Sequence, residues 1–498
     1  MNPPPNFPAT ALFTLLLASA ACMVGPQYKK PSAAAPPAFK EQPPVNFKEA
    51  EAAGWKQSQP GDAYSKGRWW ELYDDAALNA LEEQVSVSNQ NVLQAEAQYQ
   101  QARAAVSVAR AALSPTMTTT PAIATGSSKT SGGGTSFNLP FNVAWEPDLW
   151  GNIRRGVTAS TAAAQSLAAN LGNARLLYQA ELAQDYFGLH GNDGEAELLT
   201  RTEASYEEYL KLTRDRFTAG IASDLDIAQA ESQLYAVQQQ LMDLGVQRAA
   251  FEHAIAILIG KAPAELTIPP VTLNTSPPPV PLGVPSELLE RRPDIASAER
   301  QVAAANEQIG IAIAAFYPTL SLTGSAGLES SSLAKWFTWP SRFWSVGPQL
   351  AETLFDAGRR RGVVAEQRAA YDATVAAYRE TVLTAMQQVE DNLAALRILA
   401  GEADKAQQTV QAANRALDIS TAQYRSGTAG YLTVIVSQAT LLSADVTAVT
   451  LLTRRLTASV LLIEALGGGW NASQLPTKQD VIAPQRQPGA AKPGGGVR

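Results

Sequence analysis

The chain has 498 residues, of which 46% are hydrophobic and only 17% are charged, and its formal net charge is −7. Because there is no excess of Lys and Arg to neutralise phosphates, this composition argues against a nucleic-acid partner. One cysteine excludes an intramolecular disulfide, and one cysteine with two histidines is too few for a typical zinc site.

The N-terminus has the pattern of an export signal. An apolar run over residues 11–21 is too short to span a bilayer, so we expect residues 1–21 to be a signal peptide. The run ends in Ser-Ala-Ala directly before Cys22, the only cysteine. Small residues before a lone thiol predict cleavage there and a diacylglyceryl lipid on the Cys22 sulfur, with no other cofactor and no metal. A plain secretory signal with an incidental cysteine is the alternative, because residues 1–10 contain no Lys or Arg.

The rest of the chain is duplicated. A motif ending at Gly220 returns at Gly427, and a second motif ending at Gly260 returns at Gly467, both at an offset of 207 residues. A third motif, around Pro115, returns at Pro318 with an offset of 203. Several matches in order at nearly one spacing predict two structural repeats.

Each repeat opens with a helix and continues into two strands. We expect the first helices over residues 78–113 and 294–316, each ended by a proline. Period-two alternation then predicts strands with one apolar and one polar face. Glycines and serines between the strands suit hairpin loops. The expected strands cover residues 116–125, 137–145, 319–328 and 344–350.

After the strands each repeat returns to helix. Residues 151–217 and 358–424 lack proline, and a helix of this length is about 100 Å long. Gly220 and Gly427 can adopt the left-handed turn that stops a helix. Further helices are expected over residues 224–259 and 432–466. On the helices alone, an ordinary soluble bundle would be the simplest interpretation.

The strands favour an oligomer. About ten residues is the length of a membrane-spanning strand, and an open sheet edge is not tolerated in lipid. Four strands cannot close, because small barrels need about eight. The strands therefore pack in a soluble sandwich, or several chains share one barrel. Three chains would give twelve strands.

Motifs in order from Cys22 to about Gly469 resemble those of TolC-like outer-membrane efflux factors of the NodT type. The matching segments are Cys22-Met23-Val24-Gly25-Pro26, Arg68-Trp69-Trp70-Glu71-Leu72-Tyr73, Glu146-Pro147-Asp148-Leu149-Trp150-Gly151, Arg291-Arg292-Pro293-Asp294-Ile295, Phe316-Tyr317-Pro318-Thr319-Leu320 and Leu354-Phe355-Asp356-Ala357-Gly358-Arg359.

The resemblance implies an α+β membrane protein with two structural repeats per chain. A homotrimer would form a 12-stranded β-barrel in the outer membrane, in contact with its lipid, continued by a long α-helical barrel in the periplasm. Such ducts passively conduct drugs, solvents or metal ions. Their partners are a periplasmic adaptor and an inner-membrane transporter.

The expected domains follow from the repeats and the resemblance. They are a signal peptide (1–21), a lipidated N-terminal segment with an equatorial belt (22–77), the first repeat (78–260), a Pro-rich linker (261–292), the second repeat (293–470) and a C-terminal tail (471–498). The tail is rich in Pro, Gly and Gln and offers little to bury, so we expect it to be disordered.

The resemblance also indicates a periplasmic gate. In the family, acidic residues early in the last helix of each repeat line the opening, and Asp224 and Asp226 stand there in the first repeat. We take Thr433 and Val436 as their counterparts, so the second repeat is less acidic. A helix N-cap is the alternative role for Asp224. Tyr424 resembles a family tyrosine of the tip, with plain core packing as its alternative.

Two other classes of function remain to be weighed. An enzyme is not expected, because the sequence has no nucleotide loop, no metal-ligand spacing, and two histidines, His190 and His253, that stand isolated on helices. The exit duct of a type I protein secretion system would have the same fold. Neighbouring genes for an adaptor and a pump, against one for a secretion ATPase, would discriminate the two.

Overall fold

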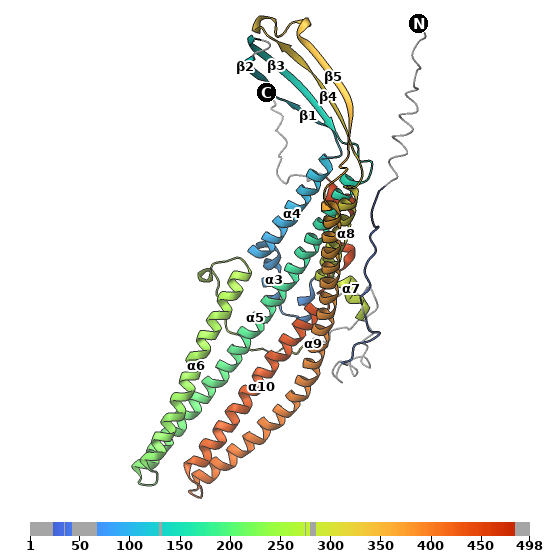
Figure 1. Ribbon diagram of the computed structural model, residues 1–498. Helices are drawn as coiled ribbons and strands as arrows, with labels where there is room; N and C mark the ends of the chain where they lie inside the picture. Colours follow the sequence, from blue (N-terminus) through green and yellow to red (C-terminus); the bar gives the residue numbers. More distant parts are fainter. Residues whose placement is uncertain are drawn as a thin grey trace, which may run out of the picture.

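The computed structural model describes residues 23–33, 35–41, 67–128, 132–273, 275–278 and 285–483. The predicted signal peptide and Cys22 lie outside the described residues. Figure 1 shows a β-sheet at one end of an elongated molecule and long helices that run from it to two hairpin turns at the other end.

Two helices of equal length set the long dimension. Helices α5 (Asn152–Thr218) and α9 (Arg359–Arg425) have 67 residues each, about 100 Å of helix. Each begins after a glycine with a left-handed backbone. Each also ends before one, at Gly220 (φ 74°) and Gly427 (φ 77°). The predicted glycine stops are therefore confirmed.

Helices α6 (Asp224–Leu258) and α10 (Tyr431–Ala465) return from the turns, with 35 residues each. Helix α6 packs on α5, and α10 packs on both α9 and α5. Their first residues are again 207 apart, which confirms the duplication. By length and mean hydropathy (1.5), α10 could cross a membrane. However, it starts at the end of the molecule opposite the sheet and is one arm of a helical hairpin (Figure 1).

The predicted helix over residues 78–113 is wrong at one point, because it breaks at Asn89 into α3 (Ala76–Ser88) and α4 (Gln90–Ala111). The Asn89 side-chain oxygen caps α4 by accepting the N–H groups of residues 91 and 92. Its amide nitrogen donates to the carbonyl of Leu258 (2.8 Å), at the end of α6. Helix α4 therefore starts where α6 stops.

The second repeat has the same junction with different chemistry. Helix α8 (Pro293–Ala314) has Arg292 as its N-cap, and the Arg292 guanidinium donates to the carbonyl of Ala465 (2.9 Å), the last residue of α10. Gly260 and Gly467 follow the ends of α6 and α10, and a Cβ on either would collide with a backbone carbonyl of the opposing segment. Each repeat is thus one long helix beside two shorter helices placed end to end.

Short elements surround these junctions. The linker contains η4 (Pro263–Glu265), η5 (Pro285–Glu287) and α7 (Leu288–Arg291). The segment η3 (Trp69–Tyr73) buries Trp69, Trp70 and Tyr73 in a core shared with α5 and α10. The tryptophans therefore act as packing anchors in this part of the molecule.

The sheet is antiparallel. Its strands are β1 (Thr116–Thr119), β2 (Ala122–Ser128), β3 (Gly132–Trp145), β4 (Thr319–Ser330) and β5 (Arg342–Ala351). The order is β1-β3-β4-β5, and β2 also pairs with β3. The predicted strand over residues 116–125 is therefore split in two. Pro121, which has no N–H group to donate to a ladder, stands at the break.

The two faces of the sheet differ as the alternation predicted. Phe141 lies opposite Ala326, and Leu320 lies opposite Leu350, which places apolar side chains on one face. On the other face Asn142 lies opposite Ser325, whose hydroxyl donates to the Asn142 side chain (2.8 Å). Within the described chain, β5 and the β1–β2 pair have one unpaired edge each.

The helices follow the order of the strands. Helices α4 and α6 pack on one side of α5, α8 and α10 on its other side, and α9 packs beyond these. One chain is therefore an open strip of wall with β5 and α9 at one edge. The β1–β2 pair and the α4–α6 stack form the other edge.

The prediction of a disordered tail over residues 471–498 is wrong for residues 471–483. The structure contains η8 (Ala472–Gln474) and α11 (Lys478–Ile482) there. Thr477 and Asp480 form a capping box, and Val481 is buried against α4 and α5. Compositional reasoning missed this one apolar anchor; residues 484–498 lie outside the described part of the chain.

Candidate functional site

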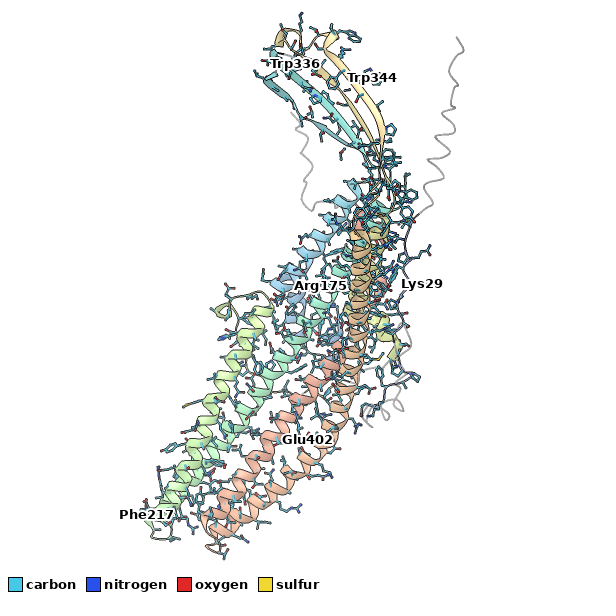
Figure 2. All side chains as sticks on the ribbon, viewed as in Figure 1. Lys29, Arg175, Phe217, Trp336, Trp344 and Glu402 are labelled. Carbon is cyan, nitrogen blue, oxygen red and sulfur yellow. The ribbon has the colours of Figure 1, made fainter. Side chains whose placement is uncertain are left out.

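The two hairpin turns form one tip. Phe217, labelled in Figure 2, marks the α5–α6 turn, and the α9–α10 turn lies at the same end. A single apolar cluster draws on both hairpins; its aromatic members are Tyr206, Tyr424 and Tyr431. The tip therefore holds the lower ends of the two repeats together.

Polar contacts of Arg216 and of Tyr209 link the hairpins, and the Tyr209 hydroxyl lies 3.0 Å from that of Thr421. The Arg216 guanidinium donates to the carbonyl of Tyr424 (2.9 Å) and lies 4.4 Å from the centre of the Tyr424 ring. Tyr424 is 4% exposed, and its ring centre is 5.3 Å from that of Tyr431. Tip packing and plain core packing, the two roles considered for Tyr424, are therefore one role here, because the apolar core that buries Tyr424 forms the tip.

The tip leaves polar atoms unpaired. At the tip, the buried hydroxyls of Tyr206 and Tyr424 have no hydrogen-bond partner among the described residues, and neither has the Nε of Arg216. Burial raises the pKa of Tyr206 to about 12, so its hydroxyl stays protonated at neutral pH. Each such group costs about 1–3 kcal/mol. The packed tip is therefore less stable than the same core would be with every polar group paired.

The acidic residues lie beside this cluster, at the start of α6. The N-cap is Ser223, so the cap role considered for Asp224 is wrong; Asp224 is exposed in the first turn. Asp226 completes the capping box, accepting the Ser223 N–H (2.8 Å). It is partly occupied by this structural role, whereas the described structure shows no hydrogen bond for the Asp224 side chain.

The second repeat has no acidic residue in the first turn of α10. Because α6 begins at Asp224 and α10 at Tyr431, Thr433 corresponds to Asp226 and Tyr431 to Asp224. Val436 is therefore not the counterpart of an aspartate, and the correspondence we took from the sequence is wrong there. Thr433 and Val436 are both exposed. The asymmetry in charge between the repeats remains.

At the other end of the helices, an N-terminal strap (residues 23–33 and 35–41) runs along α8 and α9 (Figure 1). Met23 packs over Gly151, and the Val24 N–H donates to the carbonyl of Trp150 (3.1 Å). Further along, the carboxylate of Glu390 accepts the N–H groups of Lys40 and Glu41. The first described residue after Cys22 is thus fixed where the sheet meets the helices.

One buried arginine holds the start of the strap. Arg155 is 2% exposed and donates to the carbonyls of Val24 (2.7 Å) and Pro26 (3.2 Å) and to the Glu307 carboxylate (2.7 Å). No motif or pattern in the sequence predicted this contact. Its counterpart in the second repeat is Gly362, so each chain has one such seat.

The sequence led us to expect an isolated His190, and this expectation is wrong. The His190 Nδ1 lies 2.9 Å from the Asp193 carboxylate, which also accepts from Arg248 (2.6 Å) and from the N–H of Val271 (3.1 Å). Arg248 donates in turn to the carbonyl of Ile268 (2.6 Å). The network fastens the linker to α5 and α6.

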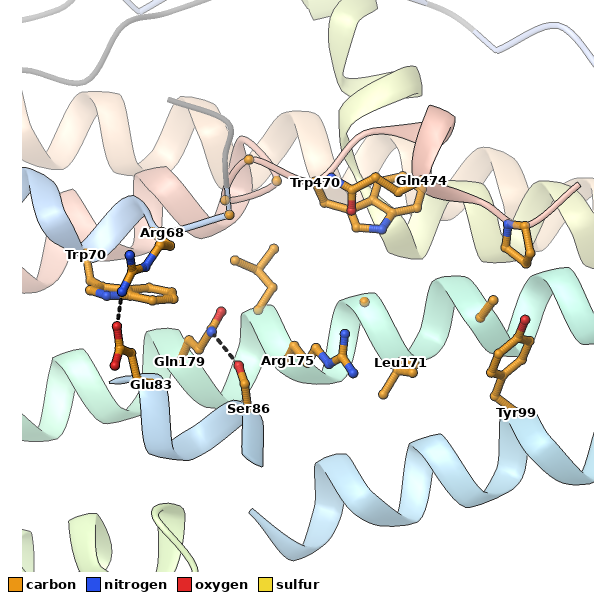
Figure 3. A pocket seen from close by; sticks show the side chains of 18 residues that line it. Arg68, Trp70, Glu83, Ser86, Tyr99, Leu171, Arg175, Gln179, Trp470 and Gln474 are labelled. Carbon is orange, nitrogen blue, oxygen red and sulfur yellow. Dashed lines mark hydrogen bonds and ion pairs between the residues drawn. The ribbon is translucent and has the colours of Figure 1, made fainter. Parts of the chain in front are cut away.

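One groove lies beside α5, between α4 and the segment that follows α10, and encloses about 570 Å³ (Figure 3). Trp70, Tyr99, Arg175 and Trp470 line it. Its one carboxylate, Glu83, is paired with Arg68. No group of three His, Cys, Asp or Glu side chains in the described ranges could hold a metal ion.

The chain combines an open sheet of membrane-spanning length with long helices that end in one tip. These features define a class of protein, the subunit of a channel that spans a membrane and continues as a helical tunnel. The exposed apolar face of the sheet needs lipid around it, and the two unpaired edges of the sheet need strands from neighbouring copies of the chain.

Comparison with known proteins identifies the family. The model of the outer membrane efflux protein family matches residues 81–261 and 284–468, one match in each repeat. Outer membrane protein OprJ of Pseudomonas aeruginosa is 32% identical over 488 residues, 94% of this chain and 97% of that protein. The solvent efflux pump outer membrane protein SrpC of Pseudomonas putida is 30% identical over 484 residues, 94% of this chain and 100% of that protein. The solved outer-membrane channel OprN superposes with a TM-score of 0.82 at 28% identity, covering 90% of this chain and 100% of that chain.

The chain therefore belongs to the outer membrane efflux protein family. It is an outer-membrane efflux channel component whose helices extend into the periplasm. The predicted fold class is confirmed: two repeats per chain, with three chains sharing one β-barrel and one α-helical barrel.

Replacing Arg216 with Ala is expected to loosen the tip. It removes a charge-assisted hydrogen bond of about 1.5–3 kcal/mol, enough to shift a closed–open ratio about tenfold. Open probability in planar-bilayer recordings should rise accordingly. Arg214→Ala is the matched control, because Arg214 pairs with Glu231 inside one hairpin (2.7 Å). Equal gating in both variants would contradict a link between the hairpins.

Proposed function

We propose that this chain is the passive exit duct of a tripartite small-molecule efflux system. A periplasmic adaptor and an inner-membrane transporter are its partners, and the chain itself performs no catalysis. The observation that carries the proposal is the combination of a membrane sheet with helices about 100 Å long that end in one packed apolar tip. Relatives named for antibiotic, toluene and solvent efflux support the substrate class of drugs and solvents.

Deleting the gene from its native host tests this function. The strain should become several-fold more sensitive to antibiotics and organic solvents, measured as minimal inhibitory concentration. Re-expression of the full chain should restore resistance. Unchanged sensitivity together with loss of a secreted polypeptide would instead assign the duct to type I protein secretion.

The strap supports a second proposal, lipid attachment at Cys22. The seat formed by Arg155 holds Val24 and Pro26 at the base of the sheet. The chain advances about 3.8 Å per residue, so Cys22 is within reach of the membrane surface. An acyl anchor there adds apolar contact with the outer-membrane lipid.

Mass spectrometry of the mature protein checks the anchor. The N-terminal peptide should begin at Cys22 and carry the mass of a diacylglyceryl group. Cys22→Ala should abolish the modification while the fold persists, because the barrel spans the membrane independently. A free thiol, or a mature chain that begins elsewhere, would contradict lipidation.

A third proposal concerns the entrance. We assign the gate to the α6 start and the tyrosine cluster, with Asp224, Asp226 and Tyr424 lining or supporting it, and with Thr433 as the uncharged counterpart of Asp226 in the second repeat. Three chains bring three copies of each aspartate near one axis. Like charges held together there attract cations into a narrow opening.

Replacing both aspartates with Asn is expected to lower the cation preference of the closed channel in planar bilayers. It should also weaken block by multivalent cations, which need several carboxylates at once. The helix should survive, because the N-cap Ser223 is unchanged and an Asn side-chain oxygen at position 226 can still accept the Ser223 N–H. Thr433→Asn is the control at the counterpart of Asp226. Selectivity unchanged in the double variant would show that the aspartates serve only the fold.

A further inference from the structure

The loop between β4 and β5 (residues 331–341) stands at the end of the sheet farthest from the helices, near Trp336 in Figure 2. Since the helices extend into the periplasm, this loop faces the outer leaflet and the cell exterior. It contains η6 (Leu333–Lys335) and η7 (Trp339–Ser341). The loop is therefore structured at the membrane boundary.

Arg342, the first residue of β5, is on the lipid-facing side of the sheet. It lies opposite Leu328, and two residues further Trp344 lies opposite Ala326, on the same face. Trp344 and Leu350 on this face are 79% and 68% exposed. The eight steps from Leu350 to Arg342 span about 27 Å along the strand, and with a tilt of about 40° they cover about 20 Å of the apolar band of about 25 Å in outer-membrane barrels. Arg342 thus stands at the outer margin of the hydrocarbon.

Aromatic side chains hold the loop against that face. The Trp336 indole donates to the carbonyl of Leu328 (3.2 Å), and its ring centre is 5.5 Å from that of Phe137. The Arg342 guanidinium lies 3.6 Å from the centre of the Trp339 ring. The Trp339 ring therefore covers the guanidinium on one side.

The backbone of Lys335 is tied to the residue that precedes this arginine. The hydroxyls of Thr338 and Ser341 both donate to the Lys335 carbonyl (2.6 Å), which fixes the backbone of the loop one residue before Arg342. The loop thus carries two cations, Lys335 from its first half and Arg342 at its end.

These cations have no carboxylate partner among the described residues. Glu329 is close in sequence, but it lies opposite Asn138, on the polar face. The strand edge that closes on β5 in the trimer cannot supply one either, because residues 116–145 contain no Asp or Glu. A cation on a lipid-facing surface is stabilised by an anion at the same depth, and the anions at that depth are lipid phosphates.

We propose that Arg342 and Lys335 form a binding site for the phosphate of a phosphorylated saccharolipid in the outer leaflet, with Trp339 orienting the guanidinium. The planar guanidinium can donate two parallel hydrogen bonds to one phosphate, and the lysine adds a point charge. With three copies per channel, the outer rim of the barrel carries three such sites. This site is independent of the cargo and of the gate.

Native mass spectrometry of the full-length trimer tests the site. The protein is titrated with bisphosphorylated lipid A and, separately, with fully dephosphorylated lipid A. The wild type should bind the phosphorylated lipid about tenfold more tightly, the effect of about 1.4 kcal/mol. The double variant Lys335→Gln/Arg342→Gln should lose that preference. Arg342→Lys should keep part of it, because the charge stays but the two-pronged geometry is lost.

The control is Arg359→Gln/Arg361→Gln, which removes the same charge from exposed positions at the opposite end of the sheet. It should bind as the wild type does. The same spectra show whether each variant remains a trimer. An unchanged preference in the Lys335/Arg342 variant, or an equal loss in the control, would overturn the site. Displacement of the lipid by millimolar inorganic phosphate would overturn its assignment to a lipid.

Discussion

The architecture depends on one kind of hydrogen bond, made once in each repeat, in which a side chain donates to a carbonyl group at the end of a helix. A helix end leaves carbonyls without partners, and α6 and α10 both end inside the protein. Asn89 satisfies Leu258 in the first repeat and Arg292 satisfies Ala465 in the second. Because these donors belong to the residues that start α4 and α8, the same contact places the upper helices on the ends of the lower ones. The wall is thereby continuous from the sheet to the tip.

The two ends of the wall differ in how well their polar groups are paired. At the base, all three nitrogens of the Arg155 guanidinium donate to nearby oxygens, and the residue is almost fully buried. At the tip, Tyr206 and Tyr424 have no partner for their hydroxyls. A satisfied network stiffens a structure, and a partly satisfied one is easier to rearrange. The hydrogen bonds of Arg155 therefore anchor the strap at the base, and the two unpaired hydroxyls lower the stability of the packed tip.

The sequence alone predicted the features that depend on residue type and on spacing along the chain. Helix ends at Gly220 and Gly427, the alternating strands and the offset of 207 residues all follow from residue type and spacing. What it could not predict depends on partners far away in the chain. Asn89 breaks a helix because α6 ends beside it, and Arg155 holds a strap that is more than 120 residues away. The tail was misjudged for the same reason, since Val481 matters only where it meets α4 and α5.

The equal lengths of the helices make the depth of the duct a property of the whole chain. The long helices have 67 residues each and the returning helices 35 each, so all six hairpins of a trimer end at one level. Removing one turn, about four residues, from α9 alone would put its hairpin out of register with α10 and with the other repeat. A shorter or longer duct needs matched changes in four helices. A point mutation can therefore change the entrance but not its distance from the outer membrane. Partner proteins have to meet the tip at that fixed distance.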